Sequence, residues 1–293
     1  MVFGSINEDN IIELNEFPTP GQTVLAENSD KCIGGKGANQ AIAAALNGAE
    51  TLMVGSVGDD GGGEKAQRAL VESNVQINLI ENSSNAPTGR AYIYVRRDGE
   101  NMIVVDPGAN SLARGDSLET YSGRPPAWSL ISLEVPEDQA MIFARQAKRA
   151  GSKIAINASP RLEGPVDPDV IDVLIVNETE VEYLAGTDWA FKENIADSLN
   201  IEAVIITQGA RGTRVDVTGS TSLHVDAIEV RPVDTTGCGD AFAGVLISQL
   251  CSGSDYLEAV QIATVYAGHV AEHAGASTSY PQAFAEAANR NQT

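Results

Sequence analysis

Two short stretches of this sequence carry residues whose types and spacing suit chemistry. The more informative is Asp234–Asp240 (DTTGCGD), whose glycines flank Cys238 and lead into a predicted helix of small residues. Successive backbone N–H groups would be bare at that helix N-terminus and would bind an anion, such as the charge that gathers on a phosphoryl group in transfer. Asp240 in the first turn would accept the proton of an attacking hydroxyl; the local alternative is that it only caps the helix.

The other stretch, Gly34–Gln40 (GGKGANQ), opens a predicted helix that is rich in alanine. Glycines let a ligand approach the exposed N–H groups of a helix start. Lys36 and Asn39 add a cation and a two-way hydrogen bonder that suit a polyhydroxyl ligand. The alanines also indicate a close helix–sheet contact, which is compatible with ligand binding. The stretch is not a Walker A loop, because Gly37 follows Lys36, and not G-x-G-x-x-G, because position 40 is Gln.

Composition excludes several classes of protein. The 293 residues carry 40 acidic and 19 basic side chains, and the net charge of −21 would repel nucleic acid. The three cysteines (Cys32, Cys238, Cys251) fit no zinc spacing, and no His–Asp arrangement activates Cys238 as a nucleophile. No apolar stretch is long enough to span a membrane, and the first residues lack the features of a signal peptide. We therefore expect a soluble, cytoplasmic protein that binds neither nucleic acid nor membrane.

Short apolar runs alternate with helical patterns along most of the chain. Such alternation indicates a doubly wound (Rossmann-like) α/β fold, with a mostly parallel sheet covered on both faces. We predict a single domain over residues 1–293. The predicted strands are Val2–Ile6, Thr51–Val57, Trp128–Leu133, Lys153–Ile156, Val173–Val176 and Ala203–Thr207. The predicted helices are Ala38–Leu46, Glu64–Ser73, Glu137–Ala150, Glu180–Ala185, Asp240–Cys251, Tyr256–His273 and Gln282–Ala288.

Two segments, roughly residues 10–33 and 88–106, break this rhythm. Within them, Ile11–Ile33 and Gly89–Val105 have extended, alternating patterns, and Asp98-Gly99 between two such runs is a hairpin signal. We interpret the segments as a small β-sheet that projects from the main domain and acts as a lid. The alternative is an antiparallel edge of the main sheet.

The two glycine-rich stretches, in this order and about 200 residues apart, closely resemble the two signatures of the ribokinase (pfkB-type) carbohydrate kinase family. The likeness covers essentially the whole chain. Four further motifs follow the family's order: Gly4–Asp9 (GSINED), Glu134, Asn177–Glu180 (NETE) and Thr207–Gly212 (TQGARG). Phe17–Gly21 (FPTPG) before Gly35–Gln40 is most similar to the ribokinase branch, whereas Thr236–Cys238 is as similar to fructokinases. The resemblance implies a doubly wound α/β domain whose β-lid closes on a sugar and can clasp a homodimer.

The resemblance also implies a reaction and roles for individual residues. The γ-phosphate of ATP would pass to the primary hydroxyl of a pentose, D-ribose, with Asp240 as base and the amides of Gly237, Cys238 and Gly239 as anion hole. Sugar hydroxyls would be bound by Asn7, Asp9, Gly35, Lys36, Asn39, Glu134 and Asp240. The nucleotide would be bound by Asn177, Thr207, Gly209, Gly212, Gly239 and Thr264. Glu180 would organise Mg²⁺ through water, and a monovalent cation, K⁺, would be held mostly by carbonyls at Asp234, Thr236, Val270, His273, Gly275 and Ser279.

Other interpretations stay open on the sequence. The acceptor can instead be fructose, deoxyribose or a nucleoside. A non-catalytic sugar-binding regulator on the same fold disagrees with the intact Asp240, Asn177 and Glu180, and a nicotinamide-dependent oxidoreductase lacks its phosphate-binding fingerprint. Glu134 and Glu180 have a plainer interpretation as helix-start carboxylates.

Overall fold

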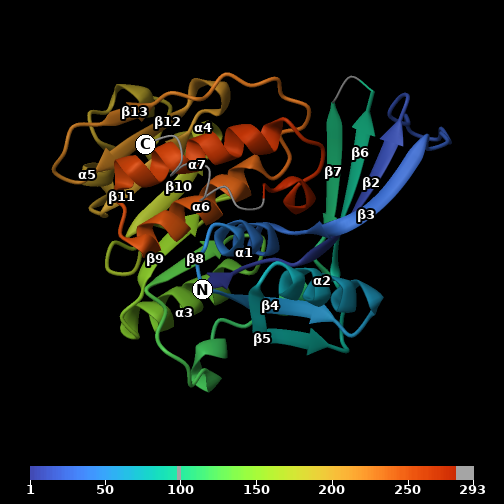
Figure 1. Ribbon diagram of the computed structural model, residues 1–293, viewed down its shortest axis with the longest axis horizontal. Helices are drawn as coiled ribbons and strands as arrows, with labels where there is room; N and C mark the ends of the chain where they lie inside the picture. Colours follow the sequence, from blue (N-terminus) through green and yellow to red (C-terminus); the bar gives the residue numbers. More distant parts are fainter. Residues whose placement is uncertain (98–99, 282–293) are drawn as a thin grey trace.

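The computed structural model of the protein describes residues 1–97 and 100–281, and it divides them between two sheets (Figure 1). The large sheet contains β1 (Val2–Phe3), β4 (Thr51–Gly58), β5 (Val75–Ser83), β8 (Trp128–Ser132), β9 (Lys153–Asn157), β10 (Val173–Asn177), β11 (Ala203–Thr207), β12 (Thr213–Val217) and β13 (Leu223–Val225). The small sheet contains β2 (Asn7–Leu14), β3 (Asn28–Gly34), β6 (Gly89–Arg96) and β7 (Asn101–Asp106).

Helices connect these strands. The α-helices are α1 (Lys36–Leu46), α2 (Gly61–Glu72), α3 (Glu137–Arg149), α4 (Glu178–Ala185), α5 (Ile195–Leu199), α6 (Cys238–Ser252) and α7 (Tyr256–Ala271). Short 3₁₀ helices lie at Gly108–Leu112, Ser117–Thr120, Trp189–Phe191, Gly209–Arg211 and Ser277–Ser279. The predicted helix Gln282–Ala288 lies outside the described residues.

The large sheet runs in the order β13-β12-β11-β10-β9-β8-β1-β4-β5. Neighbouring strands are parallel from β11 to β5, and β12 and β13 are antiparallel additions. One face packs against α1, α2, α6 and α7 and the other against α3, α4 and α5, so the sheet has an apolar core on each side. The predicted doubly wound α/β fold is confirmed. Continuous apolar strands such as Thr51–Gly58, which is buried throughout, are what a sheet covered on both faces requires.

The first predicted strand, Val2–Ile6, is too long. Pairing in the large sheet ends at Phe3, and from Asn7 the chain belongs to the small sheet. The reason lies far along the chain: the Ile6 N–H donates to Asn110 Oδ1 (2.9 Å), and Asn110 Nδ2 donates to the Ile6 carbonyl (3.2 Å). A side chain thus takes the backbone groups that a strand neighbour would have used.

The small sheet, in the order β3-β2-β6-β7, is separate from the large one and projects from its side (Figure 1). The interpretation as an edge of the main sheet is therefore wrong. Strands β6 and β7 pair antiparallel from Arg90↔Asp106 to Val95↔Asn101, which confirms the predicted hairpin, although Asp98 and Gly99 themselves lie outside the described residues.

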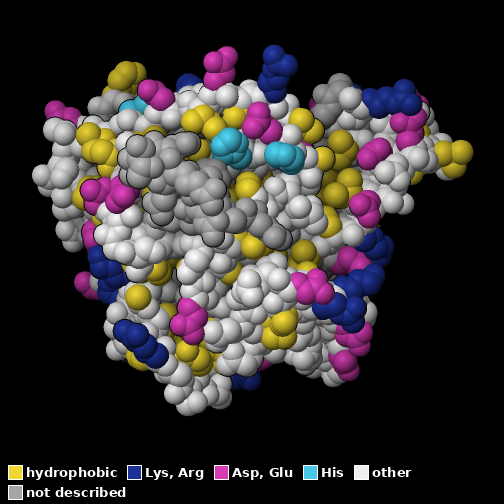
Figure 2. Space-filling model, viewed as in Figure 1, with side chains coloured by type: hydrophobic (Ala, Val, Ile, Leu, Met, Phe, Trp, Pro, Cys, Tyr) yellow, Lys and Arg dark blue, Asp and Glu magenta, His cyan; other side chains and the backbone are white. Residues whose placement is uncertain are grey.

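Acidic side chains are scattered over the face drawn in Figure 2 and do not form one patch. Among the residues that the structure describes, no helix combines the length and the apolar character needed to cross a membrane.

Candidate active site

The N-termini of α1 and α6 meet at Asp240. The two helices approach closely because Gly244 of α6 faces α1: a Cβ there would lie 2.4 Å from the Gln40 carbonyl oxygen. At this separation the first turn of α1 reaches the Asp240 carboxylate. Asn39 Nδ2 donates to Oδ2 (3.2 Å) and Gln40 Nε2 donates to Oδ1 (3.0 Å). The two predicted glycine-rich stretches are thus joined directly, across 200 residues of chain.

Asp240 does not cap its helix. The N-cap of α6 is Gly237, which makes no side-chain capping bond, and Asp240 lies in the first turn with its carboxylate bonded to α1. The local alternative of a helix cap is therefore wrong. Only 7% of Asp240 is exposed, and burial raises the pKa of its carboxyl group, opposed by the charge of Lys36 and the hydrogen bond from Gln40. Such an environment is typical of a functional carboxylate.

A second buried carboxylate, Asp9 of β2, lies at the base of the small sheet. Burial raises its pKa to about 7, with Glu134 and Asp240 adding to the effect. Asp9 Oδ1 is buried and has no hydrogen-bond partner among the described residues. The position depends on Gly34, because a Cβ there would lie 1.9 Å from Asp9 Oδ2. An unpartnered buried acceptor of this kind is suited to a ligand hydroxyl.

Asn7 is oriented by a residue that sequence reasoning missed. Asn110, which is 1% exposed, donates from Nδ2 to Asn7 Oδ1 (2.7 Å) while it also holds the backbone of Ile6. The Asn7 oxygen is thereby occupied, which leaves its NH₂ group to donate. Position 89 beside this pair requires glycine, since a Cβ on Gly89 would lie 2.2 Å from Asn110 Nδ2.

Glu134 joins the end of β8 to the start of α1. Its Oε2 accepts hydrogen bonds from Ser5 Oγ (2.7 Å) and from the Lys36 N–H (3.2 Å). It does not begin a helix, because the acidic first-turn residues of α3 are Glu137 and Asp138, so the helix-start interpretation is wrong for Glu134. Asp240 is the largest cause of the raised pKa of Lys36, so this lysine stays charged within a cluster of carboxylates.

Glu180, in contrast, does form part of a helix start. It completes a capping box with Asn177: Glu180 N–H donates to Asn177 Oδ1 (2.9 Å), and Glu180 Oε2 accepts from the Asn177 N–H (2.8 Å). Burial raises the pKa of Glu180, although the Asn177 N–H opposes the shift.

A hollow of about 590 Å³ lies beside the N-terminus of α6. It brings together five of the six predicted nucleotide-binding residues, Thr207, Gly209, Gly212, Gly239 and Thr264, whereas Asn177 does not line it. Much of its apolar wall comes from one segment, namely Ala227, Ile228, Val230 and Pro232. Sequence reasoning missed this segment because it carries neither a regular periodicity nor a glycine motif.

A second hollow of about 350 Å³ lies under the small sheet. Asp9, Ile11 and Ile93 of the sheet line one side, and residues 232–236 and 274–276 line the other. Thr235 lines both hollows, so they adjoin at the start of α6. Gly239, in the first turn of α6, lines the first of these hollows, and a Cβ at this position would have no atom within 4 Å.

The start of α6 is shaped for close approach. Gly237 has a φ of 76°, and the Tyr280 hydroxyl donates to its carbonyl (2.9 Å). The Cys238 N–H donates to the Thr235 carbonyl (3.2 Å). Burial raises the pKa of the Cys238 thiol to about 11, which agrees with the prediction that it is not a nucleophile.

The predicted monovalent-cation residues lie on two neighbouring loops. Asp234 accepts from the N–H groups of Thr236 (Oδ1, 2.9 Å) and Gly275 (Oδ2, 2.9 Å), and the Ser279 hydroxyl donates to the Gly275 carbonyl (2.7 Å). Burial alone would raise the pKa of Asp234, but these backbone hydrogen bonds hold it below its ordinary value. Val270 and His273 lie at the end of α7, where the His273 N–H donates to the Val270 carbonyl (3.1 Å). Within the described residues, no group of three or more His, Cys, Asp or Glu side chains is arranged to hold a metal ion.

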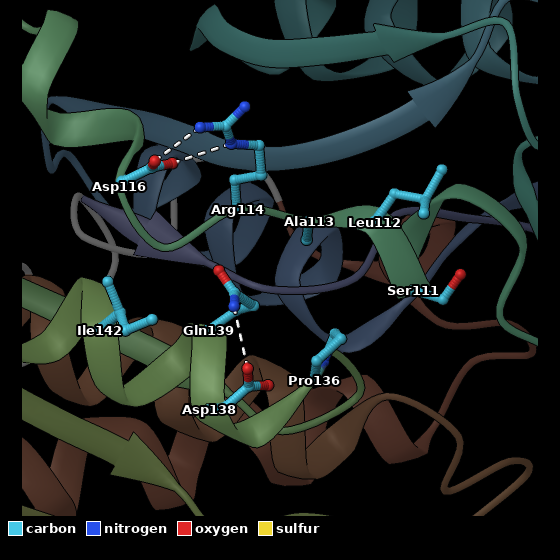
Figure 3. A pocket seen from close by; sticks show the side chains of 9 residues that line it. All are labelled: Ser111, Leu112, Ala113, Arg114, Asp116, Pro136, Asp138, Gln139 and Ile142. Carbon is cyan, nitrogen blue, oxygen red and sulfur yellow. Dashed lines mark hydrogen bonds and ion pairs between the residues drawn. The ribbon is translucent and has the colours of Figure 1, made fainter.

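A third hollow, of about 540 Å³, lies between residues 111–116 and the start of α3 (Figure 3). Its polar side chains bind one another: Arg114 pairs with both oxygens of Asp116 (3.0 and 2.6 Å), and Gln139 Nε2 donates to Asp138 (2.9 Å). Gln139 Oε1 also accepts from the Gly115 N–H (3.1 Å). These groups are already satisfied, and none of the predicted site residues lines this hollow.

Two adjoining hollows near the N-terminus of α6, with a buried carboxylate in the first turn of that helix, are typical of a phosphotransferase of the α/β class. The model of the pfkB family of carbohydrate kinases matches residues 1–283, and the chain belongs to this family.

Curated relatives agree with this assignment. A ribokinase of Haemophilus influenzae is 32% identical over 290 residues, which cover 96% of this chain and 94% of the relative. A ribokinase of Staphylococcus aureus is 31% identical over 292 residues, with 96% of each chain covered. The solved structure of Arabidopsis thaliana ribokinase complexed with ribose and ATP superimposes with a TM-score of 0.85 at 28% identity, covering 96% of this chain and 95% of the other.

Proposed function

We propose that this protein transfers the γ-phosphate of ATP to the primary hydroxyl of D-ribose, giving ribose 5-phosphate. The observation that carries the proposal is Asp240, a buried carboxylate held by α1 in the first turn of α6, beside Cys238 and Gly239, which line the hollow of about 590 Å³. The similar ribokinases of known sequence, and the superimposed ribokinase with ribose and ATP, support ribose as the acceptor.

In this proposal the sugar lies under the small sheet. The Asn7 NH₂ group would donate to one sugar hydroxyl, and the Asp9 carboxylate would accept from its neighbour. A sugar analogue that lacks one of these hydroxyls would bind poorly, because it would leave a buried polar group unpaired. Asp9 is the predicted sugar-binding residue that lines this hollow; Lys36, Asn39 and Glu134 would reach the sugar from the start of α1 and the end of β8, and Gly35 would leave it room at the N-cap of α1. Asp240 takes the proton of the attacking hydroxyl as the oxygen–phosphorus bond forms.

The triphosphate would extend into the hollow lined by Thr207, Gly212 and Thr264, with its γ-phosphoryl group at the amides of residues 237–239. The N–H groups and dipole of α6 would stabilise the charge that accumulates there. ATP is the co-substrate of this family of kinases. Direct transfer of its γ-phosphate to a sugar hydroxyl needs the nucleotide and the sugar side by side, and the two hollows adjoin.

Two cations fit this arrangement. One Glu180 oxygen accepts the Asn177 N–H, and its carboxylate can also accept from a water of Mg²⁺, which keeps several of its own waters. The ionised Asp234 and the carbonyls of its two loops are oxygen ligands of the kind that K⁺ takes. Both ions would offset negative charge beside the triphosphate, which matters in a chain of net charge −21.

We also propose that the small sheet is a lid that clasps a second copy of the chain. Its edge strand β7 is exposed along its whole length, and Met102, Ile103, Val104 and Val105 are each 46–57% exposed. Because side chains alternate along a strand, both faces of this edge are apolar, which is a liability unless another chain covers it. Val104→Lys should convert a dimer to a monomer in light scattering; an unchanged mass would contradict the clasp.

The free cysteines of the described chain suit the cytoplasm.

The deciding experiment is a coupled ADP-release screen over D-ribose, 2-deoxyribose, fructose and nucleosides, with and without K⁺. We expect the highest kcat/KM with D-ribose and stimulation by K⁺. Deoxyribose is included because a deoxyribokinase of Salmonella typhimurium is 30% identical over 291 residues. Sugar binding without ADP release from any acceptor would contradict a kinase and favour a regulator.

A further inference from the structure

We propose that Gln40 is a positioning residue that holds the Asp240 carboxylate by Oδ1 and thereby assigns Oδ2 as the oxygen that takes the proton. The inference rests on the proposed function, because it specifies how the base of that reaction is oriented. Gln40 ends the glycine-rich stretch at the start of α1, and the sequence alone predicts no role for it.

Gln40 acts through Asp240 and not on a ligand, because its side chain is 0% exposed. Asn39 and Asp240 keep 5% and 7% of their surface. The first turn of α1 therefore presents two buried amides to the carboxylate, and of these Asn39 keeps a small exposed area whereas Gln40 keeps none.

The two carboxylate oxygens are correspondingly unequal. Oδ1 accepts from Gln40 Nε2 at 3.0 Å, which fixes it toward the helix pair α1–α6. Oδ2 accepts at a longer 3.2 Å from Asn39, itself a predicted sugar-binding residue. An attacking hydroxyl can therefore approach Oδ2 beside Asn39 without displacing the bond that orients the carboxylate.

Burying an amide at position 40 destabilises the folded state, so packing alone does not explain why a glutamine stands there. Gln40 Oε1 is buried and, among the described residues, has no hydrogen-bond partner. Leaving such an acceptor unsatisfied destabilises the folded state, and an apolar side chain of similar volume would fill the space without that cost. The donor that Gln40 supplies to Asp240 is what an apolar residue cannot replace.

The same bond favours the form of Asp240 that can act as a base. Burial raises the pKa of Asp240, and the Gln40 hydrogen bond opposes that rise together with Lys36. A carboxylate that is protonated at neutral pH cannot accept a proton, so the donor keeps the base usable.

Gln40→Leu tests the inference, with steady-state kinetics from pH 6 to 9.5. Loss of a hydrogen bond to a charged carboxylate should raise its pKa by roughly 1–2 units. The acid limb of the kcat profile should therefore move to higher pH by about that amount. At a given pH on that limb kcat should fall about 10–100-fold, and it should recover at high pH, with both KM values within about twofold. Gln40→Glu, which keeps the shape, should move the limb further, because two adjacent carboxyls share a proton.

Asn47→Leu is the matched control, because it removes another buried amide, at the other end of the same helix. Asn47 is 5% exposed and donates to the Ala43 carbonyl (2.9 Å), away from Asp240. It should lower the unfolding temperature and leave the pH profile in place. A folded Gln40→Leu or Gln40→Glu enzyme with an unmoved acid limb overturns the inference, as does a loss confined to KM for the sugar. A wild-type protein that phosphorylates no acceptor overturns the proposed function instead.

Discussion

Replacing Asp240 by Asn removes the proposed base with almost no change of shape. The structure can accommodate the new amide: Asn39 Oδ1 and Gln40 Oε1 are both buried without partners among the described residues, so either side chain can turn its own amide to accept from the introduced NH₂ group. The substitution also removes a carboxylate whose ionisation burial disfavours. We therefore expect Asp240→Asn to fold normally and to unfold at an equal or higher temperature at pH 8.

The effect on turnover follows from the role of the carboxylate. General-base catalysis contributes about 10²–10⁴-fold, or roughly 3–5 kcal/mol of barrier, so kcat should fall by that factor. ATP affinity, measured by calorimetry, should stay within about threefold because the nucleotide hollow is lined by other residues. A folded Asp240→Asn enzyme with kcat within tenfold of wild type would refute the assignment of the base.

Four further predictions concern the residues under the small sheet. Because the pKa of Asp9 is raised to about 7, KM for the sugar should fall as the pH rises from 6 to 8 and ionised Asp9 accepts hydroxyl hydrogen bonds; a flat KM would contradict this. The raised pKa also means that Asp9 binds a proton more tightly in the folded state than in the unfolded state. The free energy of unfolding, measured by urea titration, should therefore fall between about pH 4 and pH 7, and Asp9→Asn should flatten that slope. Gly34→Ala should raise KM for the sugar at least tenfold, since its Cβ would lie 1.9 Å from Asp9 Oδ2, whereas Gly61→Ala, with nothing within 4 Å, should leave KM unchanged. Asn110→Asp, which loses the donor to Asn7, should raise KM for the sugar and not for ATP, and equal rises in both would refute its positioning role.

Regular elements in the middle of the chain were predictable because their pattern is local. The strands at Trp128–Ser132 and Ala203–Thr207 contain mostly apolar residues and fall within one residue of their predicted bounds. The antiparallel strands Thr213–Val217 and Leu223–Val225 were missed, since polar residues interrupt their apolar pattern. The early end of β1 was not predictable, because Asn110, which takes the Ile6 backbone groups, lies 104 residues away.

The same distinction applies to the site. The glycine-rich motifs identify Asp240, but on local grounds a cap and a base were equally good interpretations. The hydrogen bonds from Asn39 and Gln40 decide between them, and they exist only because Gly244 lets α1 and α6 approach. Residues that orient others, such as Asn110, carry no motif of their own, so only the folded geometry reveals them.

Charge is the remaining constraint on how the site works. Asp9, Glu134, Asp240 and Glu180 place four carboxyls around the proposed reaction centre, and burial raises the pKa of three of them. A triphosphate adds several more negative charges. Lys36 and the N-terminus of α6 supply too little positive charge to balance both. We infer that cations bound with the nucleotide make up the difference, so the site should hold ATP weakly without divalent metal ions.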